Sequence, residues 1–360
     1  MAIKILKPGL ASSVQDLGRE GYYHLGIPPS GALDRYSLTA ANLLVGNPPG
    51  SAALECTLFG ADVAFEQDTV FAVSGATIAL KLDDEAVPLN TCLLARRGQV
   101  LKMSFATQGS RCCLAIAGGI DVPQALDSRS TYTLGALGGY LGRPLQVGDS
   151  LPVTTACSHG PVGLQLPVEL QPKLAQQVQL RVLPGMYIDR LTPESVESFF
   201  SDNWAVSTES DRIGYRFGKG RPLAFKPRTP PFGAGSDPSN IVDACYPIGS
   251  IQIPAGLQPI VLHRDAVSGG GYMTLGTVIS CDLDILGQLQ PHARVNFTRV
   301  TMEQALTVRH EQQSLLQQME KRLVDDAVSW QQKRASTWNC LLKWLWRYSP
   351  EHRAWLPGRD

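Results

Sequence analysis

Residues 63–82 read VAFEQDTVFAVSGATIALKL, and this stretch decides the fold that the sequence predicts. Three short runs within it, at 63–65, 69–73 and 77–82, are rich in β-branched, aromatic and aliphatic residues, with turn residues between them. Runs of that length and composition are typical of β-strands. The chain also contains 34 Gly and 25 Pro, which favour many turns and therefore many short strands. We expect a mainly β protein with a few helices.

Further strands are predicted on both sides of this stretch, at residues 3–6 and 114–117. One helix is expected between them, at residues 37–44, because its apolar residues recur on one face. Asp34 precedes this helix, where a carboxylate can cap free backbone N–H groups. The sequence Gly-Asn-Pro-Pro-Gly at 46–50 ends it.

The second half of the chain repeats this mixture of strands and few helices. Strands are predicted at 178–183, 249–253, 259–262, 277–280 and 294–299. A helix is predicted at 192–200, with Thr192 as its cap and Pro193 in its first turn. Residues 302–327 show the apolar spacing of a long amphipathic helix rich in Gln and Glu.

We expect two domains and a tail, because 360 residues exceed the roughly 250–300 residues at which single cores stop growing. Residues 1–155 form an N-terminal β-rich domain, 156–176 a linker poor in periodic apolar residues, and 177–300 the second domain. Residues 301–360 form a helical tail rich in Gln and Trp. The tail contains five of the six tryptophans, which can lie on a membrane surface, dock a partner or pack on the protein itself.

Charge and cysteine content narrow the class of protein. Lys+Arg and Asp+Glu both number 32, so net charge does not favour a nucleic-acid partner. No apolar run approaches the ~20 residues of a membrane-spanning helix. The eight cysteines form no CxxC pair and no secretory segment follows Met1, so we expect buried, reduced thiols in a cytoplasmic protein. Adjacent Cys112 and Cys113 are expected to point to opposite faces of a strand.

Familiar catalytic and nucleotide-binding motifs are missing. Residues 135–142 are Gly-rich but lack the GxGxxG spacing of a dinucleotide site, and residues 214–219 are one residue short of a phosphate-binding loop. The sequence has no HExxH, no GxSxG and no paired histidines for zinc. We therefore expect no metal site built by this chain.

Five clusters instead combine glycine with polar and charged residues, at 13–19, 30–34, 118–131, 210–216 and 252–272. Glycine lets backbone N–H groups approach an anion, and arginine supplies a fork for carboxylate or phosphate. Aspartate can hold such an arginine, accept a substrate N–H or act as a base. Arg–Asp pairs that only fix loops are the alternative for any single cluster.

At these clusters the chain resembles a known family. The blocks that carry the resemblance include SSVQDLGREGYYHLGIPPSGALD (12–34), AIAGGIDVP (115–123), SDRIGYRF (210–217) and GSIQIPAGLQPIVLHRDAVSGGGY (249–272). They are similar to the C subunit of bacterial 5-oxoprolinase, a family also known as the Kip-type antagonist or allophanate hydrolase subunit 2 family. It is related to the carboxyltransferase domain of urea carboxylase. The resemblance extends over roughly residues 3–305.

The resemblance implies two cyclophilin-like β-barrel domains with a ligand cleft between or inside them. It also implies that the chain is the C subunit of an ATP-dependent 5-oxoprolinase, an enzyme that opens 5-oxo-L-proline to L-glutamate. The implied partners are the A and B subunits, and the complex would use ATP with Mg²⁺. One alternative is a carboxyltransferase that acts on a urea-like amide, with carboxybiotin from another chain. A second alternative is a non-catalytic regulatory protein, which the altered loop at 267–269 and the added aromatic tail favour.

The expected site residues follow from motif membership and chemistry. Asp265, Arg212 and Gln252 are the expected catalytic residues: Arg212 would face an anionic group, while Asp265 and Gln252 would orient the amide. The expected substrate-binding residues are Asp16, Arg19, Gly31, Asp34, Ser128, Arg129, Ser130, Asp211, Tyr215, Gly270, Gly271 and Tyr272. Among these, Arg129 would face an anion as well, and Asp16, Arg19 and Asp34 would shape the mouth of the site. All of them should converge on one hollow.

Overall fold

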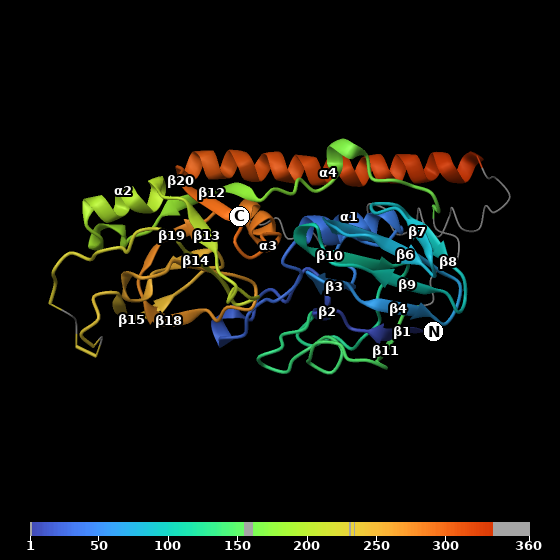
Figure 1. Ribbon diagram of the computed structural model, residues 1–360, viewed down its shortest axis with the longest axis horizontal. Helices are drawn as coiled ribbons and strands as arrows, with labels where there is room; N and C mark the ends of the chain where they lie inside the picture. The colour runs from blue at the N-terminus through green and yellow to red at the C-terminus, as the bar shows by residue number, and fades with distance from the viewer. Residues whose placement is uncertain (1, 155–160, 230–231, 234, 334–360) are drawn as a thin grey trace.

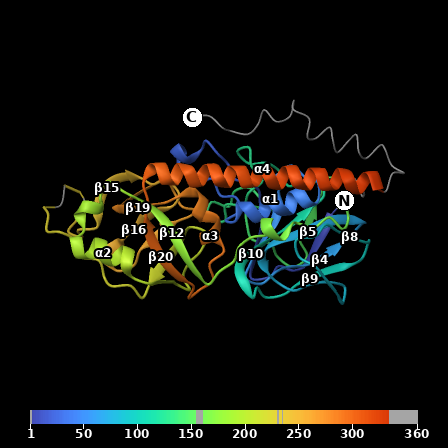
Figure 2. The same cartoon turned by 90° about the horizontal axis from the view of Figure 1, so that it is seen from above.

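A computed structural model of the chain describes residues 2–154, 161–229, 232–233 and 235–333. Two β-rich halves lie side by side, and the long helix α4 (Met302–Lys333) runs along both of them (Figure 1). The view from above shows the same helix extending over both halves (Figure 2). The mainly β fold with a few helices and a long C-terminal helix is therefore confirmed.

The first half contains two antiparallel sheets. One sheet has the order β11 (Ser150–Pro152), β1 (Ala2–Lys7), β4 (Asp62–Phe65), β9 (Val100–Met103), β6 (Leu80–Leu82) and β7 (Glu85–Val87). The other has the order β2 (Ala11–Gln15), β3 (Ala53–Thr57), β10 (Gln108–Ile116), β5 (Thr69–Thr77) and β8 (Leu93–Ala95). All three strands predicted within residues 63–82 fall on or overlap β4, β5 and β6.

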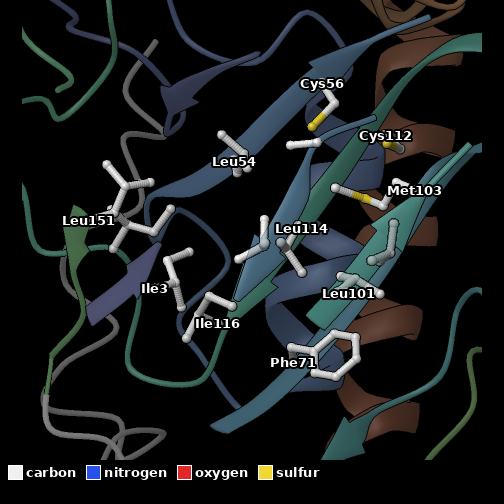
Figure 3. Packing of buried hydrophobic residues seen from close by; sticks show 14 of the residues in the cluster. Ile3, Leu54, Cys56, Phe71, Leu101, Met103, Cys112, Leu114, Ile116 and Leu151 are labelled. Atoms are coloured by element: carbon white, nitrogen blue, oxygen red, sulfur yellow. The ribbon is translucent and has the colours of Figure 1, made fainter. Parts of the chain in front are cut away.

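The core of this half lies between the two sheets. Ile3 and Leu101 from one sheet meet Leu54, Phe71 and Leu114 from the other, and all five are fully buried (Figure 3). Burying such side chains contributes about 1.5–3 kcal/mol each before entropy is counted. The strands of this half thus enclose one apolar interior, as two facing sheets.

Helix α1 (Arg35–Leu44) covers the outer face of the second sheet. Its N-cap is Asp34, whose Oδ1 accepts the backbone N–H of Ser37 at 2.8 Å, as predicted. Cys112 belongs to the core between the sheets, whereas Cys113 belongs to the cluster under α1. The predicted alternation of these two cysteines is confirmed. Met319 of α4 packs into the same outer cluster.

The second half closes into a seven-stranded barrel. Its order is β12 (Gln177–Pro184), β19 (Thr274–Val278), β16 (Ser250–Gln252), β17 (Ile260–Leu262), β14 (Gly214–Gly218), β13 (Trp204–Val206) and β20 (Arg294–Arg299). A parallel pairing between β12 and β20 closes the barrel. Trp204, Phe217 and Phe297 fill its interior. The predicted cyclophilin-like barrel of this half agrees with this closed sheet.

Smaller elements complete the second half. Helix α2 (Pro193–Ser201) is capped by Thr192, as predicted, and α3 (Leu283–Gly287) faces the first half. A separate two-stranded antiparallel sheet is formed by β15 (Asn240–Cys245) and β18 (Gly269–Tyr272). The short 3-10 helices are η1 (Tyr23–Leu25), η2 (Val168–Leu170), η3 (Ile188–Arg190), η4 (Pro254–Gly256) and η5 (Ser280–Asp282).

Two sequence expectations change. The described part of the predicted linker, 161–176, is not a bare connection: Leu164, Leu166 and Leu170 are buried against the first half. We expected every cysteine to be buried, but Cys245 is exposed. It is the last residue of β15, in the small two-stranded sheet. The five other described cysteines are buried and free. The Trp-rich segment after residue 333 lies outside the described residues, and the domain boundaries stay a prediction.

Within the described residues, no helix has the length and apolar character needed to cross a membrane.

The two halves meet where Leu33 of the first half enters the core of the second. Leu33 packs among the buried side chains of that core and is fully hidden from solvent. Gly287, at the end of α3, packs so closely that a Cβ there would lie 2.6 Å from the Leu33 carbonyl oxygen. A larger residue at position 287 would therefore push the halves apart.

We predict that Gly287→Ala lowers the free energy of unfolding by about 1–3 kcal/mol, the usual cost of overpacking a tight contact. Urea unfolding followed by tryptophan fluorescence measures this change. The matched control is Gly218→Ala in β14, where a Cβ would meet nothing within 4 Å. Equal effects of the two substitutions would contradict the close contact at the boundary.

Candidate functional site

Arg212, in the turn before β14, connects the two halves. Its Nε donates to Asp265 Oδ2 at 2.9 Å, within the second half. Its Nη1 donates to Glu55 Oε1 at 2.5 Å, and its Nη2 to the Gly31 carbonyl oxygen at 2.7 Å, both in the first half. Burial opposes the charge of Arg212, but Asp265 and Glu55 together outweigh burial and raise its pKa. The nitrogens of Arg212 are thus occupied by protein oxygens, not held free for a substrate anion as we expected.

Glu55 is the matching centre on the first half. Its carboxylate is 2% exposed and also accepts the backbone N–H of Leu33 at 2.7 Å. Arg111 Nε lies 4.0 Å from the same carboxylate, and Arg111 Nη1 donates to Tyr215 Oη at 2.5 Å. Removing one partner of such a buried charge pair typically costs about 3–5 kcal/mol. This network fixes how the halves sit against each other.

Two predicted substrate-binding residues belong to this structural network. Tyr215 is 2% exposed, and its hydroxyl, which accepts a hydrogen bond from Arg111, donates to the Gly287 carbonyl oxygen at 3.2 Å. Burial raises its pKa. Asp211 Oδ1 accepts the backbone N–H groups of Ile213 and Gly214 and so forms the turn that carries Arg212. Tyr215 is therefore a structural residue, and Asp211 shapes the turn through its Oδ1.

Arg19 is satisfied less completely than Arg212. It is 1% exposed, its Nη2 donates to the Ser130 carbonyl oxygen, and its Nε and Nη1 have no acceptor. Burial lowers its pKa, while Asp16 in the first half and Asp265 in the second oppose that shift. No carboxylate lies within ion-pair distance of Arg19 in the part of the chain that the structure describes. A buried arginine with two nitrogens that lack acceptors is a feature of this boundary that can take a ligand.

Asp16 organises the loop beside Arg19. Its Oδ1 accepts from Ser128 Oγ at 2.7 Å and Ser130 Oγ at 2.5 Å, and its Oδ2 accepts the Arg129 backbone N–H at 2.6 Å. The predicted grouping of Asp16, Ser128 and Ser130 with Arg19 is therefore present. The guanidinium of Arg129 points elsewhere: it donates to Asp121 Oδ1 at 3.0 Å and to the Val122 carbonyl oxygen.

Tyr132 is a site residue that sequence reasoning missed. Its ring is buried, and burial, followed by the charge of Asp265, raises its pKa. Its hydroxyl makes no hydrogen bond among the described residues. The Gly-rich stretch after it is a signal that could have found this place: Gly138, at φ +67°, passes so close that a Cβ would lie 2.7 Å from Arg19 Nη2. Here glycine makes room for an arginine, not for a nucleotide.

We call Arg19, Asp16, Ser130, Tyr132 and Asp265 the boundary site. It combines a buried arginine with two nitrogens that lack acceptors, a carboxylate from the opposite half and a phenol hydroxyl with no hydrogen bond among the described residues. Such a set can bind an anionic group at one end and a polar N–H or carbonyl group at the other. Gly31 contributes its carbonyl oxygen to Arg212 instead of binding a ligand through its N–H.

The remaining predicted residues gather elsewhere, around Tyr246. The Tyr246 hydroxyl donates to the Tyr272 carbonyl oxygen at 2.6 Å, and the side chain of Gln252 hydrogen-bonds to the same hydroxyl. Gly270 packs on the Tyr246 ring. Gly271 is exposed in strand β18. No hydrogen bond or ion pair between described residues joins Gln252 to Arg212 or Asp265, so the predicted set forms two clusters instead of one.

The segment His263-Arg264-Asp265 is held rigidly where it reaches the boundary. His263 Nδ1 accepts the Arg264 backbone N–H at 2.9 Å, and its Nε2 lies 3.2 Å from the Leu283 carbonyl oxygen. Burial, aided by Arg264 and Arg111, lowers the pKa of His263 well below its usual value, so the ring is neutral. The Asp265 backbone N–H donates to the Arg212 carbonyl oxygen at 3.0 Å. The Asp265 carboxylate is thereby fixed in place.

No group of three or more His, Cys, Asp or Glu side chains that could hold a metal ion occurs among residues 2–154, 161–229, 232–233 and 235–333.

The architecture and sequence match a known family. The family model described as carboxyltransferase domain, subdomain A and B, matches residues 25–299. The chain belongs to this family. The crystal structure of Kluyveromyces lactis urea carboxylase, another protein with this architecture, superposes with a TM-score of 0.81 at 35% identity, over 88% of this chain and 29% of that one. The resemblance inferred from the sequence blocks is confirmed.

Curated relatives of this carboxyltransferase-domain protein differ in size. The C subunit of Escherichia coli 5-oxoprolinase is 36% identical over 321 residues, which is 89% of this chain and 98% of the relative. Saccharomyces cerevisiae urea amidolyase is 35% identical over 322 residues, 86% of this chain. The matched part is 17% of that much longer relative.

Asp34 belongs to the interface between the halves, not to the mouth of a site. It is 2% exposed and accepts from Ser37 and from Gln288 Nε2, the latter at 2.5 Å. Burial, reinforced by Asp284, raises its pKa to about 7, although Gln288 and Ser37 oppose the shift. An ordinary aspartate has a pKa of about 3.9.

This shift predicts a pH-dependent stability. Between about pH 4 and 7 the folded state binds more protons at Asp34 than the unfolded state does. The contribution of Asp34 to the free energy of unfolding therefore decreases as the pH rises through this range. We expect the free energy of unfolding to fall by up to about 1.4 kcal/mol per pH unit from this group. Asp34→Asn should flatten the dependence of the unfolding free energy on pH. Asp284→Asn should shift this dependence to lower pH, because the charge of Asp284 helps to raise the pKa of Asp34. Urea unfolding between pH 4.5 and 8 measures both, and an unchanged slope in Asp34→Asn would contradict the assignment.

Proposed function

We propose that this chain is the C subunit of an ATP-dependent 5-oxoprolinase and helps convert 5-oxo-L-proline to L-glutamate in a complex with homologues of the A and B subunits. The observation that carries the proposal is the boundary site, with its buried arginine whose Nε and Nη1 lack acceptors. Correspondence to 98% of the length of the E. coli C subunit supports the same choice. We place the complex in the cytoplasm, as the sequence suggests.

The chemistry of 5-oxoproline suits the boundary site. This substrate carries a carboxylate and, in its lactam ring, an N–H donor beside a carbonyl oxygen. Arg19 would bind the carboxylate through Nε or Nη1, where the structure leaves donors without acceptors. Asp265 would accept the lactam N–H, and the Tyr132 hydroxyl would donate to the lactam oxygen as negative charge develops there.

The Gly-rich stretch 135–142 and the boundary site do not fit ATP and Mg²⁺. The Gly-rich stretch 135–142 packs on protein atoms, since a Cβ at Gly139 would lie 1.8 Å from Thr131 Oγ1. The boundary site has a single arginine without acceptors, and its Asp16 is already saturated by serine and backbone donors. We therefore assign nucleotide chemistry to the partner proteins. This chain binds and orients the amide and shields it from water.

The second candidate is a carboxyltransferase component that acts on a urea-like amide, with carboxybiotin from another chain. The family description and the likeness to urea carboxylase favour it. Urea is neutral, so under this alternative Arg19 would face the carboxylate carried by biotin. The two candidates therefore differ in which small molecule depends on Arg19.

The test is reconstitution with homologues of the A and B subunits, followed by ATP hydrolysis that depends on 5-oxoproline. We expect the wild-type complex to be active and Arg19→Gln to lower kcat/KM at least about tenfold, as loss of a charged hydrogen bond does. Arg19→Lys should recover part of the loss. The matched control is Arg96→Gln, which removes a surface arginine paired with Asp68 at 2.6 Å.

Two controls make the result decisive. Copurification with the partners and an unchanged melting temperature show that a variant is folded. Urea-dependent and biotin-dependent turnover by the wild-type complex would favour the carboxyltransferase alternative. Normal 5-oxoproline turnover by a folded Arg19→Gln complex would remove the boundary site from the proposal.

A further inference from the structure

A second pair of arginines lies on the barrel, away from the boundary site. An isolated bridge pairs Leu191 with Phe225, and the Lys226 backbone N–H donates to the Arg190 carbonyl oxygen at 2.8 Å. These contacts hold the end of η3 beside residues 225–228. Arg190 therefore lies beside the segment that carries Arg228. Burial, aided by the charge of Arg228, lowers the pKa of Arg190.

Both guanidinium groups keep donors without acceptors. The Arg190 guanidinium lies over the Tyr187 ring, 4.5 Å from its centroid, and its Nη1 is sealed from solvent without a partner. Arg228 Nε is sealed and unpartnered in the same way, although its Nη2 donates to the Asn240 carbonyl oxygen. Stacking and this single hydrogen bond fix the orientation of the two guanidinium groups, but neither interaction supplies a negative charge.

No carboxylate lies within 4.0 Å of either arginine among the residues that the structure describes. Other arginines do have such a partner: Arg143 pairs with Asp149 at 2.8 Å, and Arg221 pairs with Asp202 at 2.6 Å. The positions nearest to Arg228 in sequence that lie outside the described residues, 230, 231 and 234, are Pro, Pro and Ala, which carry no charge. Two adjacent cations without a counter-charge are destabilising unless an anion joins them.

We infer that Arg190 and Arg228 form a binding site for the phosphate group of a small molecule. Two guanidinium charges match a phosphate, which carries about −1.5 to −2 at pH 7, better than a singly charged carboxylate. Guanidinium edges also match phosphate oxygens in geometry. The site lies at the end of the barrel near α2 and the start of β15, which Figure 1 shows remote from the sheets of the first half. The inference is independent of the proposed function.

The experiment uses the full chain with inorganic phosphate, phosphoserine, acetate and chloride at equal ionic strength. Calorimetric titration and melting temperature are the readouts. We expect both phosphate compounds, or inorganic phosphate alone, to bind and raise the melting temperature more than acetate or chloride. Binding by both probes indicates a phosphate ester as ligand, and binding by inorganic phosphate alone indicates free phosphate.

Variants separate a binding role from a structural one. Arg190→Gln and Arg228→Gln should each weaken phosphate binding at least roughly tenfold, the effect of losing one charged partner. Without phosphate, Arg190→Gln should melt at about the wild-type temperature, because the stacking lost on Tyr187 is offset by relief of the repulsion from Arg228. The matched control is Arg221→Gln, which removes one positive charge from the same half and should leave phosphate binding unchanged.

Two results would overturn the inference. In the first, phosphate raises the melting temperature no more than chloride does, which is charge screening only. In the second, Arg190→Gln keeps full phosphate affinity but melts earlier than wild type, which would make Arg190 a structural residue.

Discussion

The arrangement of the molecule depends on the hydrogen bonds that Arg212 makes to Asp265, Glu55 and the Gly31 carbonyl oxygen. They join a carboxylate of the barrel to a carboxylate and a loop of the first half. Because this cation and both carboxylates are largely hidden from water, the geometry between the halves is tightly specified. Arg111, bonded to Tyr215 beside Glu55, extends the same network.

That constraint explains how a site can form from residues distant in sequence. Arg19 comes from a loop of the first half and Asp265 from the barrel, and each bears on the other only because the halves are locked together. Glycine supplies the room: Gly138 lets the backbone pass over the Arg19 guanidinium. Arg19 lies outside the network and keeps two nitrogens with donors to offer.

Sequence reasoning found the strands around residues 63–82, the caps at Asp34 and Thr192, and the family, because local patterns and long motif blocks carry that information. It also grouped Asp16, Ser128 and Ser130 with Arg19. It could not tell that Arg212 and Tyr215 are satisfied by protein partners, since the acceptor, Glu55, sits in an ordinary-looking strand. Gln252 and Tyr272 share a motif block with Asp265, but nearness in sequence does not fix which face of the barrel a side chain occupies. Tyr132 was missed because a lone tyrosine before a Gly-rich stretch has no motif.

The central claim is that the boundary between the halves binds an anionic amide through Arg19 and Asp265. A crystal structure of the assembled complex with 5-oxo-L-proline measures this most directly. The account predicts the substrate carboxylate within hydrogen-bond distance of Arg19 Nε or Nη1, with the lactam N–H facing Asp265. Substrate bound around Tyr246 or wholly within a partner protein, with Arg19 still lacking an acceptor, would contradict it.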